Sequence, residues 1–130
     1  MIADTTFLID LLRGKKEAVE LLSKINKELK TTIINQYETF VGINSIVGID
    51  TEKKVRDTKI FFQNFDILPL DEDAMFRSAR LCGMLIQKGR TIDDNDCMIA
   101  GIALRNGIDK IITRNKSHFE RISEIKVISY

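Results

Sequence analysis

Short runs of apolar, β-branched residues alternate with longer stretches of helical periodicity along this chain, and this alternation most constrains its fold. The strand candidates are apolar at nearly every position, which indicates strands buried on both faces. The sequence predicts strands at 1–3, 31–34, 66–70, 110–113 and 126–128. Helices are predicted from Asp4 or Thr5 to Gly14, over about 15–29, 35–47, 51–62, 71–89 and 93–106, and around 119–121. This pattern predicts an α/β fold of three layers, α/β/α, with a central, mainly parallel sheet of four to five strands.

Length and apolar content indicate a single domain over residues 1–130, since 130 residues with 44% apolar side chains suffice for one core. No apolar run approaches the roughly 18 residues that a membrane span needs, so we expect no membrane contact. We also expect no targeting segment. The cysteines Cys82 and Cys97 lack the spacing of zinc ligands and are interpreted as free thiols of a reduced, cytoplasmic protein.

The charges exclude a nucleic-acid binder that works by bulk attraction, because 20 basic and 19 acidic residues leave a net charge of only +1. Any polyanion must therefore be held locally. Because His118 is the only histidine, paired-histidine acid–base chemistry and a histidine-rich metal site are excluded. Beside Phe119, it is interpreted as a packing or surface residue.

Polar side chains collect where the predicted strands end. Asp4 follows the first strand, and Glu38 lies in the opening turn of the helix after the second strand. Asp96, with Asp93 and Asp94 beside it, lies in the first turns of the helix that precedes the fourth strand, and Asn115 comes shortly after that strand. Because ligands of open parallel sheets bind beyond the carboxyl ends of the strands, we expect these groups to converge there.

The carboxylates of Asp4, Glu38 and Asp96 would repel one another unless a cation lay between them. The amide of Asn115 would lie beside them. Oxygen ligands favour a hard divalent ion, Mg²⁺ or Mn²⁺. Such an ion activates water and neutralises charge on a phosphoryl group. The constellation therefore predicts hydrolysis of a phosphodiester.

Each of these residues also has a purely structural interpretation. Asp4 is a suitable helix N-cap, and Asn115 is a common loop residue. Glu38 and the group Asp93, Asp94 and Asp96 would complement helix dipoles. Only the joint pattern favours a site.

Four segments together resemble the PIN-domain ribonucleases, specifically the VapC-like toxins of toxin–antitoxin pairs. They are Met1-Ile2-Ala3-Asp4-Thr5, the strand and helix of Thr32 to Gly42 that carry Glu38, Gly89 to Ala100 with Asp96, and Ile111-Ile112-Thr113-Arg114-Asn115-Lys116-Ser117-His118-Phe119. The resemblance covers essentially the whole chain.

The resemblance implies a metal-dependent endoribonuclease. Asp4, Glu38 and Asp96 would bind Mg²⁺ or Mn²⁺ directly or through water, and Thr5 and Thr113 would donate hydrogen bonds to these ligands. Asn115 stands where many relatives carry Asp, so Asp93 or Asp94 is an alternative contributor. The expected partners are an RNA substrate, an antitoxin protein and a second copy of the chain. The candidate RNA contacts are Arg90, Arg114 and Lys116.

Two further alternatives remain beside the toxin. A PIN domain that serves RNA processing, or one that only binds RNA, would share the same motifs. A phosphorelay receiver domain is disfavoured, because the third predicted strand ends in Leu68-Pro69-Leu70 without an acceptor aspartate.

Overall fold

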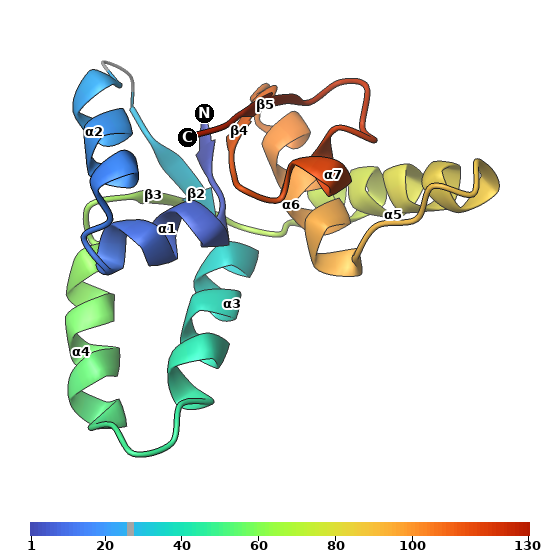
Figure 1. Ribbon diagram of the computed structural model, residues 1–130. Coiled ribbons are helices and arrows are strands. Elements are labelled where there is room, and N and C mark those ends of the chain that lie inside the picture. The colour runs from blue at the N-terminus through green and yellow to red at the C-terminus, as the bar shows by residue number, and fades with distance from the viewer. Residues whose placement is uncertain (26–27) are drawn as a thin grey trace.

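The computed structural model describes residues 1–25 and 28–130, with seven helices and five strands in those ranges (Figure 1). The elements in chain order are β1 (Ile2–Ala3), α1 (Thr5–Leu12), α2 (Lys16–Lys24), β2 (Lys30–Thr32), α3 (Ile33–Asn44), α4 (Thr51–Phe62), β3 (Asp66–Leu68), α5 (Glu72–Gln87), α6 (Asp94–Arg105), β4 (Lys110–Ile112), α7 (Lys116–Phe119) and β5 (Lys126–Ile128).

The five strands form one sheet in the order β3-β2-β1-β4-β5, and every pairing is parallel. The predicted α/β class and the strand count are confirmed. β1 occupies the centre, where Ile2 pairs with Lys30 of β2 on one side and with Ile111 of β4 on the other. The residue that follows β1, Asp4, therefore emerges at the middle of the carboxyl edge.

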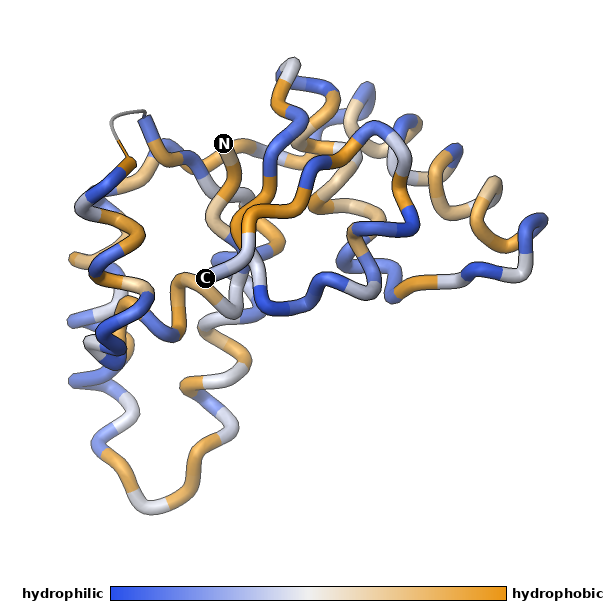
Figure 2. Tube along the Cα trace, turned by 45° about the horizontal axis from the view of Figure 1, so that its top comes forward, coloured by the Kyte–Doolittle hydropathy of each residue, from blue (hydrophilic) through white to orange (hydrophobic). Residues whose placement is uncertain are grey.

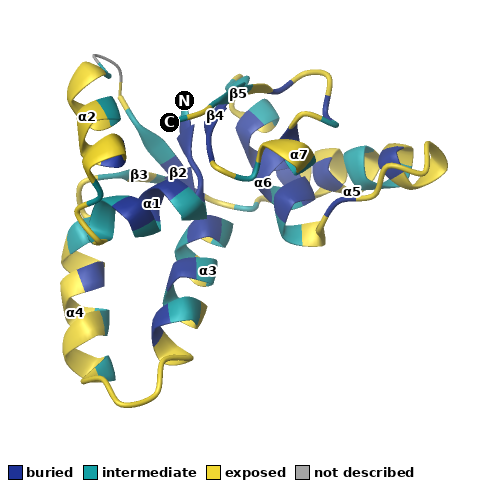
Figure 3. Cartoon of the chain, viewed as in Figure 1, coloured by how far each residue is buried: buried dark blue, intermediate teal, exposed yellow. Residues whose placement is uncertain are grey.

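Consecutive residues of the central strands point into two separate cores, as the pleat requires. Ile2 and Ile111 pack in one core with residues of α5, α6 and α7. Ala3 and Ile112 pack in the other core with residues of α1, α2 and α4. Helices thus cover both faces of the sheet and complete the expected three layers; Figure 3 shows the central strands as the buried middle of the molecule.

The helices are amphipathic: hydrophilic and hydrophobic residues alternate around most of them (Figure 2). None of the helices in the described ranges combines the length and the apolar character needed to cross a bilayer. The pair formed by α3 and α4 extends away from the sheet, with a connection at residues 45–50 (Figure 1).

The second strand and the helix after it have different bounds from those predicted. β2 ends at Thr32, and the β-branched Ile33 and Ile34 already belong to α3. The reason is a reciprocal cap: the Asn35 backbone N–H donates to Thr32 Oγ1, and the Thr32 backbone N–H donates to Asn35 Oδ1. This cap stabilises the helix start against the strand propensity of the two isoleucines.

Other predicted bounds also needed correction. The helix predicted over 35–47 ends at Asn44, and α4 keeps its predicted bounds, with Asp50 as the N-cap through a bond from the Lys53 backbone N–H to Oδ1. The helix predicted over 15–29 ends at Lys24, and residues 26–27 of that prediction lie outside the described ranges. The short helix predicted around 119–121 lies at 116–119 instead, and most of the remaining ends shift by one or two residues.

Candidate active site

A pocket of about 350 Å³ lies at the carboxyl edge of the sheet and brings together all four predicted site residues. They come from separate parts of the fold: Asp4 follows β1, Glu38 belongs to α3, Asp96 to α6, and Asn115 precedes α7. The lining comprises Asp4, Thr5, Thr6, Glu38, Asp93, Asp94, Asn95, Asp96 and Asn115. The convergence expected from parallel strand topology is therefore present.

The carboxylate of Asp4 is buried and is fixed by three side chains. Its Oδ2 accepts hydrogen bonds from Thr113 Oγ1 at 2.6 Å and Thr6 Oγ1 at 3.1 Å, and its Oδ1 accepts one from Asn35 Nδ2 at 3.0 Å. Although Asp4 occupies the N-cap position of α1, its side chain makes no capping bond. The capping interpretation of this residue is therefore wrong.

Glu38 faces the same pocket from the second turn of α3, because this helix begins at Ile33. Its Oε1 accepts a hydrogen bond from Thr5 Oγ1 at 2.7 Å, as the resemblance implied for Thr5, and its Oε2 accepts one from Asn95 Nδ2 at 3.4 Å. Burial raises the pKa of the Glu38 carboxyl, and the negative charges of Asp4 and Asp96 raise it further, against the lowering effect of these bonds.

Asp96 in the first turn of α6 is also buried, and two side chains donate to the same oxygen. Its Oδ2 accepts hydrogen bonds from His118 Nδ1 at 2.6 Å and from Asn115 Nδ2 at 3.1 Å. Burial raises the pKa of the Asp96 carboxyl, and the charge of Asp4 adds to this effect, while the His118 bond opposes it. Asn115 thus contacts a site carboxylate instead of adding a fourth charge.

The sequence interpretation missed two residues of the site. His118 is not a mere packing residue, since its ring lies against Asp96 and Asn115. Its spacing of three from Asn115, across the start of α7, was an available signal. Asn35 is completely buried and donates from Nδ2 to both Asp4 Oδ1 and Thr5 Oγ1. Nothing in its sequence context separates that role from simple helix capping.

Capping behaviour separates the helix-start residues into two groups. The side chains of Thr32, Asp50 and Asp71 accept bonds from the backbone of their own helices. By contrast, Asp4 and Asn115 occupy N-cap positions without making such a bond, and both line the pocket. Their polar groups therefore remain available to one another and to a ligand.

Arg114, one of the candidate RNA contacts, is exposed and also pairs with side chains of its own chain. Its Nε donates to Asp10 Oδ2 at 2.8 Å, and its guanidinium lies over the Tyr130 ring at 5.0 Å from the centroid. Lys15 Nζ also contacts Asp10, at 2.7 Å from Oδ1. Lys116 and Arg90 are exposed as well, and no ion pair of theirs is found among the described residues.

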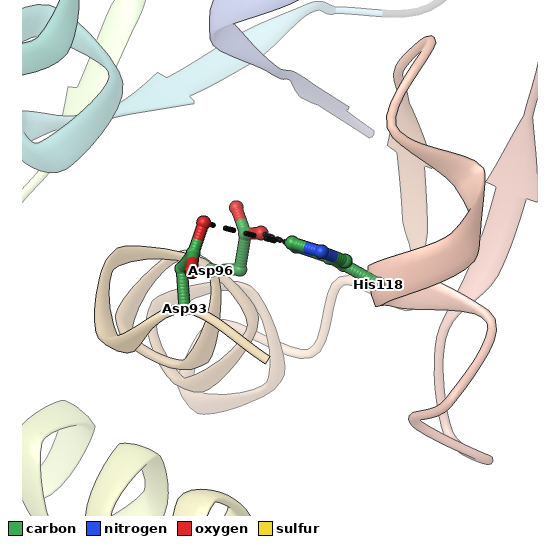
Figure 4. Close-up of side chains that lie close together, drawn as sticks. All are labelled: Asp93, Asp96 and His118. Atoms are coloured by element: carbon green, nitrogen blue, oxygen red, sulfur yellow. Dashed lines mark hydrogen bonds and ion pairs between the residues drawn. The ribbon is translucent and has the colours of Figure 1, made fainter. Parts of the chain in front are cut away.

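The residues present fit a divalent cation. Three carboxylates share one pocket, and their mutual repulsion raises the pKa of Glu38 and Asp96, beyond the effect of burial. Oxygen donors of this kind suit hard ions. Within residues 1–25 and 28–130, one set of three side chains also has potential ligand atoms within 4.8 Å of one another: Asp93, Asp96 and His118 (Figure 4).

Comparisons with known proteins agree with this fold. Ribonuclease VapC1 of Methanocaldococcus jannaschii is 28% identical over 130 residues, which cover 100% of this chain and 86% of the relative. The DNA-bound VapBC of Salmonella typhimurium superposes with a TM-score of 0.85 at 22% identity, covering 98% of this chain and 96% of the other. VapBC2 of Rickettsia felis, bound to a promoter DNA fragment, gives a TM-score of 0.84 at 22% identity and covers 99% and 97%.

The family profile of the PIN domain matches residues 1–125, which is nearly the entire chain. It includes the central strand, the two helices that carry Glu38 and Asp96, and the segment of Asn115 and His118. The chain belongs to the PIN domain family.

Proposed function

We propose that this protein is a divalent-metal-dependent endoribonuclease, the toxin of a toxin–antitoxin pair. The observation that carries the proposal is that Asp4, Glu38 and Asp96 line one pocket, each held by its own set of hydrogen-bond donors. The name of the archaeal relative, Ribonuclease VapC1, supports RNA as the substrate.

Asp4 and Asp96 would hold Mg²⁺ or Mn²⁺, with Glu38 as a direct or water-mediated third ligand. The cation would supply charge neutralisation at the phosphate and activation of the attacking water. The donors on Asp4 and Asp96 fix these carboxylates before the ion arrives, which lowers the cost of ordering them. Glu38 Oε2, which has only one long bond to Asn95, would accept the proton of the attacking water. Its raised pKa suits that role.

Exposed basic residues at the rim would hold the RNA strand. Lys116 directly follows the pocket residue Asn115, and Arg90 lies in the segment between α5 and α6, three residues before Asp93. Such contacts add affinity that falls with salt concentration. A phosphate that must reach a carboxylate pocket favours single-stranded or loop RNA over a duplex.

An antitoxin protein and a second copy of the chain are the proposed protein partners. Large apolar side chains are exposed on α3, on α4 and on the connection between them, including Tyr37 at 62%, Ile60 at 61% and Val47 at 96%. Exposed apolar surface of this kind marks protein contacts. An antitoxin that silences such an enzyme implies a shared compartment, and we propose the cytoplasm.

The test is cleavage of a panel of structured and unstructured RNAs with Mg²⁺, with Mn²⁺ and with a chelator. Asp4→Asn should abolish metal-dependent cleavage and leave the circular dichroism spectrum unchanged. Asp66→Asn is the matched control, because Asp66 begins β3 at the opposite edge of the sheet, and it should retain activity. Wild-type cleavage by Asp4→Asn, or cleavage that persists in the chelator, would refute the proposed mechanism.

Expression in a bacterial host distinguishes a toxin from an RNA-processing enzyme. The wild-type protein should arrest growth, and co-expression of its antitoxin should restore growth. Asp4→Asn should be harmless. A protein that cleaves RNA in vitro but does not impair growth would assign the nuclease to RNA processing.

A further inference from the structure

In the proposed nuclease chemistry, His118 serves only as a hydrogen-bond donor to Asp96. Its imidazole reaches the site from α7, and Nδ1 lies 2.6 Å from Asp96 Oδ2 and 4.0 Å from Asp93 Oδ2 (Figure 4). The side chain is 27% exposed, so an ion in solution can reach it. No other histidine occurs in the 130 residues.

The side chain of Asp93 is largely exposed and does not bond to the backbone of its own helix. It occupies the N-cap position of α6, yet its side chain makes no capping bond. Its carboxylate instead lies on the side of His118 and Asp96, with Oδ2 at 4.0 Å from His118 Nδ1. Potential ligand atoms of Asp93, Asp96 and His118 all lie within 4.8 Å of one another, so one cation can contact all three side chains.

We propose that Asp93, Asp96 and His118 Nδ1 form a cation subsite that prefers a divalent transition-metal ion such as Zn²⁺ over Mg²⁺. Two bonds of about 2.1 Å to a common ion can span up to about 4.2 Å, and the 2.6 Å and 4.0 Å separations from Nδ1 lie within that span. The donor set of two carboxylates and one imidazole supplies the nitrogen ligand that zinc accepts readily and Mg²⁺ does not favour.

Asn115 completes the surroundings of this subsite. Its terminal amide group lies 3.1 Å from both Asp96 Oδ2 and His118 Nδ1. With the amide turned by half a rotation, the carbonyl oxygen would take that place and face the ion. The uncharged side chain of Asn115 thereby suits the subsite, whereas a carboxylate at this position would add a third negative charge to those of Asp93 and Asp96.

The decisive probe is nuclear magnetic resonance of the histidine ring with Zn²⁺ or Mg²⁺ added to the RNA-free protein. Because the chain has one histidine, its two ring nitrogen resonances are unambiguous. Zn²⁺ should shift the Nδ1 resonance with saturation near one equivalent, and Mg²⁺ should leave it in place. A Zn²⁺ titration that saturates without moving Nδ1, or that moves Nε2 instead, would overturn the subsite.

Calorimetric titration of variants with Zn²⁺ tests the ligand set. His118→Ala and Asp93→Asn should each weaken Zn²⁺ binding by more than about tenfold. Asp94→Asn and Cys82→Ala are the controls: Cys82 Sγ lies 3.6 Å from Asp94 Oδ1, so they test this neighbouring thiol and acid as the true ligands. A loss of Zn²⁺ binding in these controls, with none in His118→Ala, would refute the proposal.

His118→Asn distinguishes a metal ligand from a hydrogen-bond donor. An asparagine amide can still donate to Asp96 from about the place of Nδ1, but it offers no imidazole nitrogen. Zn²⁺ binding should fall in His118→Asn as in His118→Ala, and unchanged Zn²⁺ affinity would show that His118 only orients Asp96. None of these measurements depends on RNA cleavage, so the subsite and the proposed nuclease can fail independently.

Discussion

Replacement of Asn35 by alanine should disturb the active site and the fold together, because this buried amide joins the two. Its Nδ2 donates to Asp4 Oδ1 at 3.0 Å and to Thr5 Oγ1 at 3.1 Å, and Thr5 in turn donates to Glu38. Its Oδ1 accepts from Thr32 Oγ1 at 2.7 Å. The Asn35 side chain therefore orients two of the three carboxylates and takes part in the cap at the start of α3.

The magnitude follows from the bonds lost in Asn35→Ala. A hydrogen bond to a charged acceptor contributes about 1.5–3 kcal/mol, and a bond between neutral groups about 0.5–1.5 kcal/mol. The pocket beside Asp4 lets water replace part of the loss. We therefore expect the free energy of unfolding to fall by about 2–4 kcal/mol, measured by urea unfolding with an unchanged m-value. RNA cleavage should fall as well, because Asp4 loses one of its three hydrogen-bond donors.

Two further variants define what would refute this reasoning. Asn44→Ala removes an exposed asparagine of the same helix and should change the free energy of unfolding by less than about 0.5 kcal/mol. Asn35→Asp places a carboxylate beside Asp4, so its destabilisation should be larger at pH 7 than at pH 4, where protonation relieves the repulsion. If Asn35→Ala were as stable as Asn44→Ala, Asn35 would not support the site.

Three other predictions follow from the packing and the charges. Gly101→Ala would place a Cβ 2.0 Å from Ser78 Oγ and 2.8 Å from Ser78 N, so it should lower the free energy of unfolding in urea by about 1–3 kcal/mol. Adding Ser78→Gly to this variant should restore only part of the loss, because the contact with the Ser78 backbone remains. With metal chelated, the raised pKa of Glu38 makes its contribution to stability present below pH 4.5 and lost as the pH rises through the folded-state pKa. The melting temperature of Glu38→Gln should therefore rise relative to that of the wild type from about pH 4 to 7. A difference in melting temperature that stays constant with pH would contradict this reasoning. Tyr130→Phe removes the hydroxyl that donates to Asp10 Oδ2 at 2.9 Å and should cost about 1–2 kcal/mol in thermal unfolding; no change would mean that Lys15 and Arg114 alone satisfy Asp10.

The layers and the edge of the site could be predicted from the sequence because they depend on local patterns. Apolar, β-branched pairs such as Ile111-Ile112 mark buried strands, and a parallel sheet places all carboxyl ends on one side. This rule predicts that Asp4 and Asn115 lie at the same edge of the sheet, even when the strand order is unknown. The order itself depends on which strands pair, and no local pattern of two- or three-residue strands encodes it.

Helix starts were less predictable, because they depend on which side chain bonds to which backbone group. Ile33 and Ile34 have the composition of a strand, and only the reciprocal bonds of Thr32 and Asn35 place them in α3. The same shift moves Glu38 from the first turn into the second, which removes the helix-dipole interpretation of this residue.

The resemblance implied Thr5 and Thr113 as donors to the carboxylates, but most of the other partners could not be predicted, because they join residues about twenty to sixty positions apart. Asn35 Nδ2 reaches Asp4 across 31 positions, and His118 Nδ1 reaches Asp96 across 22. An isolated histidine beside a phenylalanine has the sequence context of a packing residue. Its role appears only when α7 and α6 meet, since the chemistry of a side chain depends on the groups that the fold brings to it. A site of this kind is therefore best sought among N-cap residues whose side chains make no hydrogen bond to the backbone of their own helix.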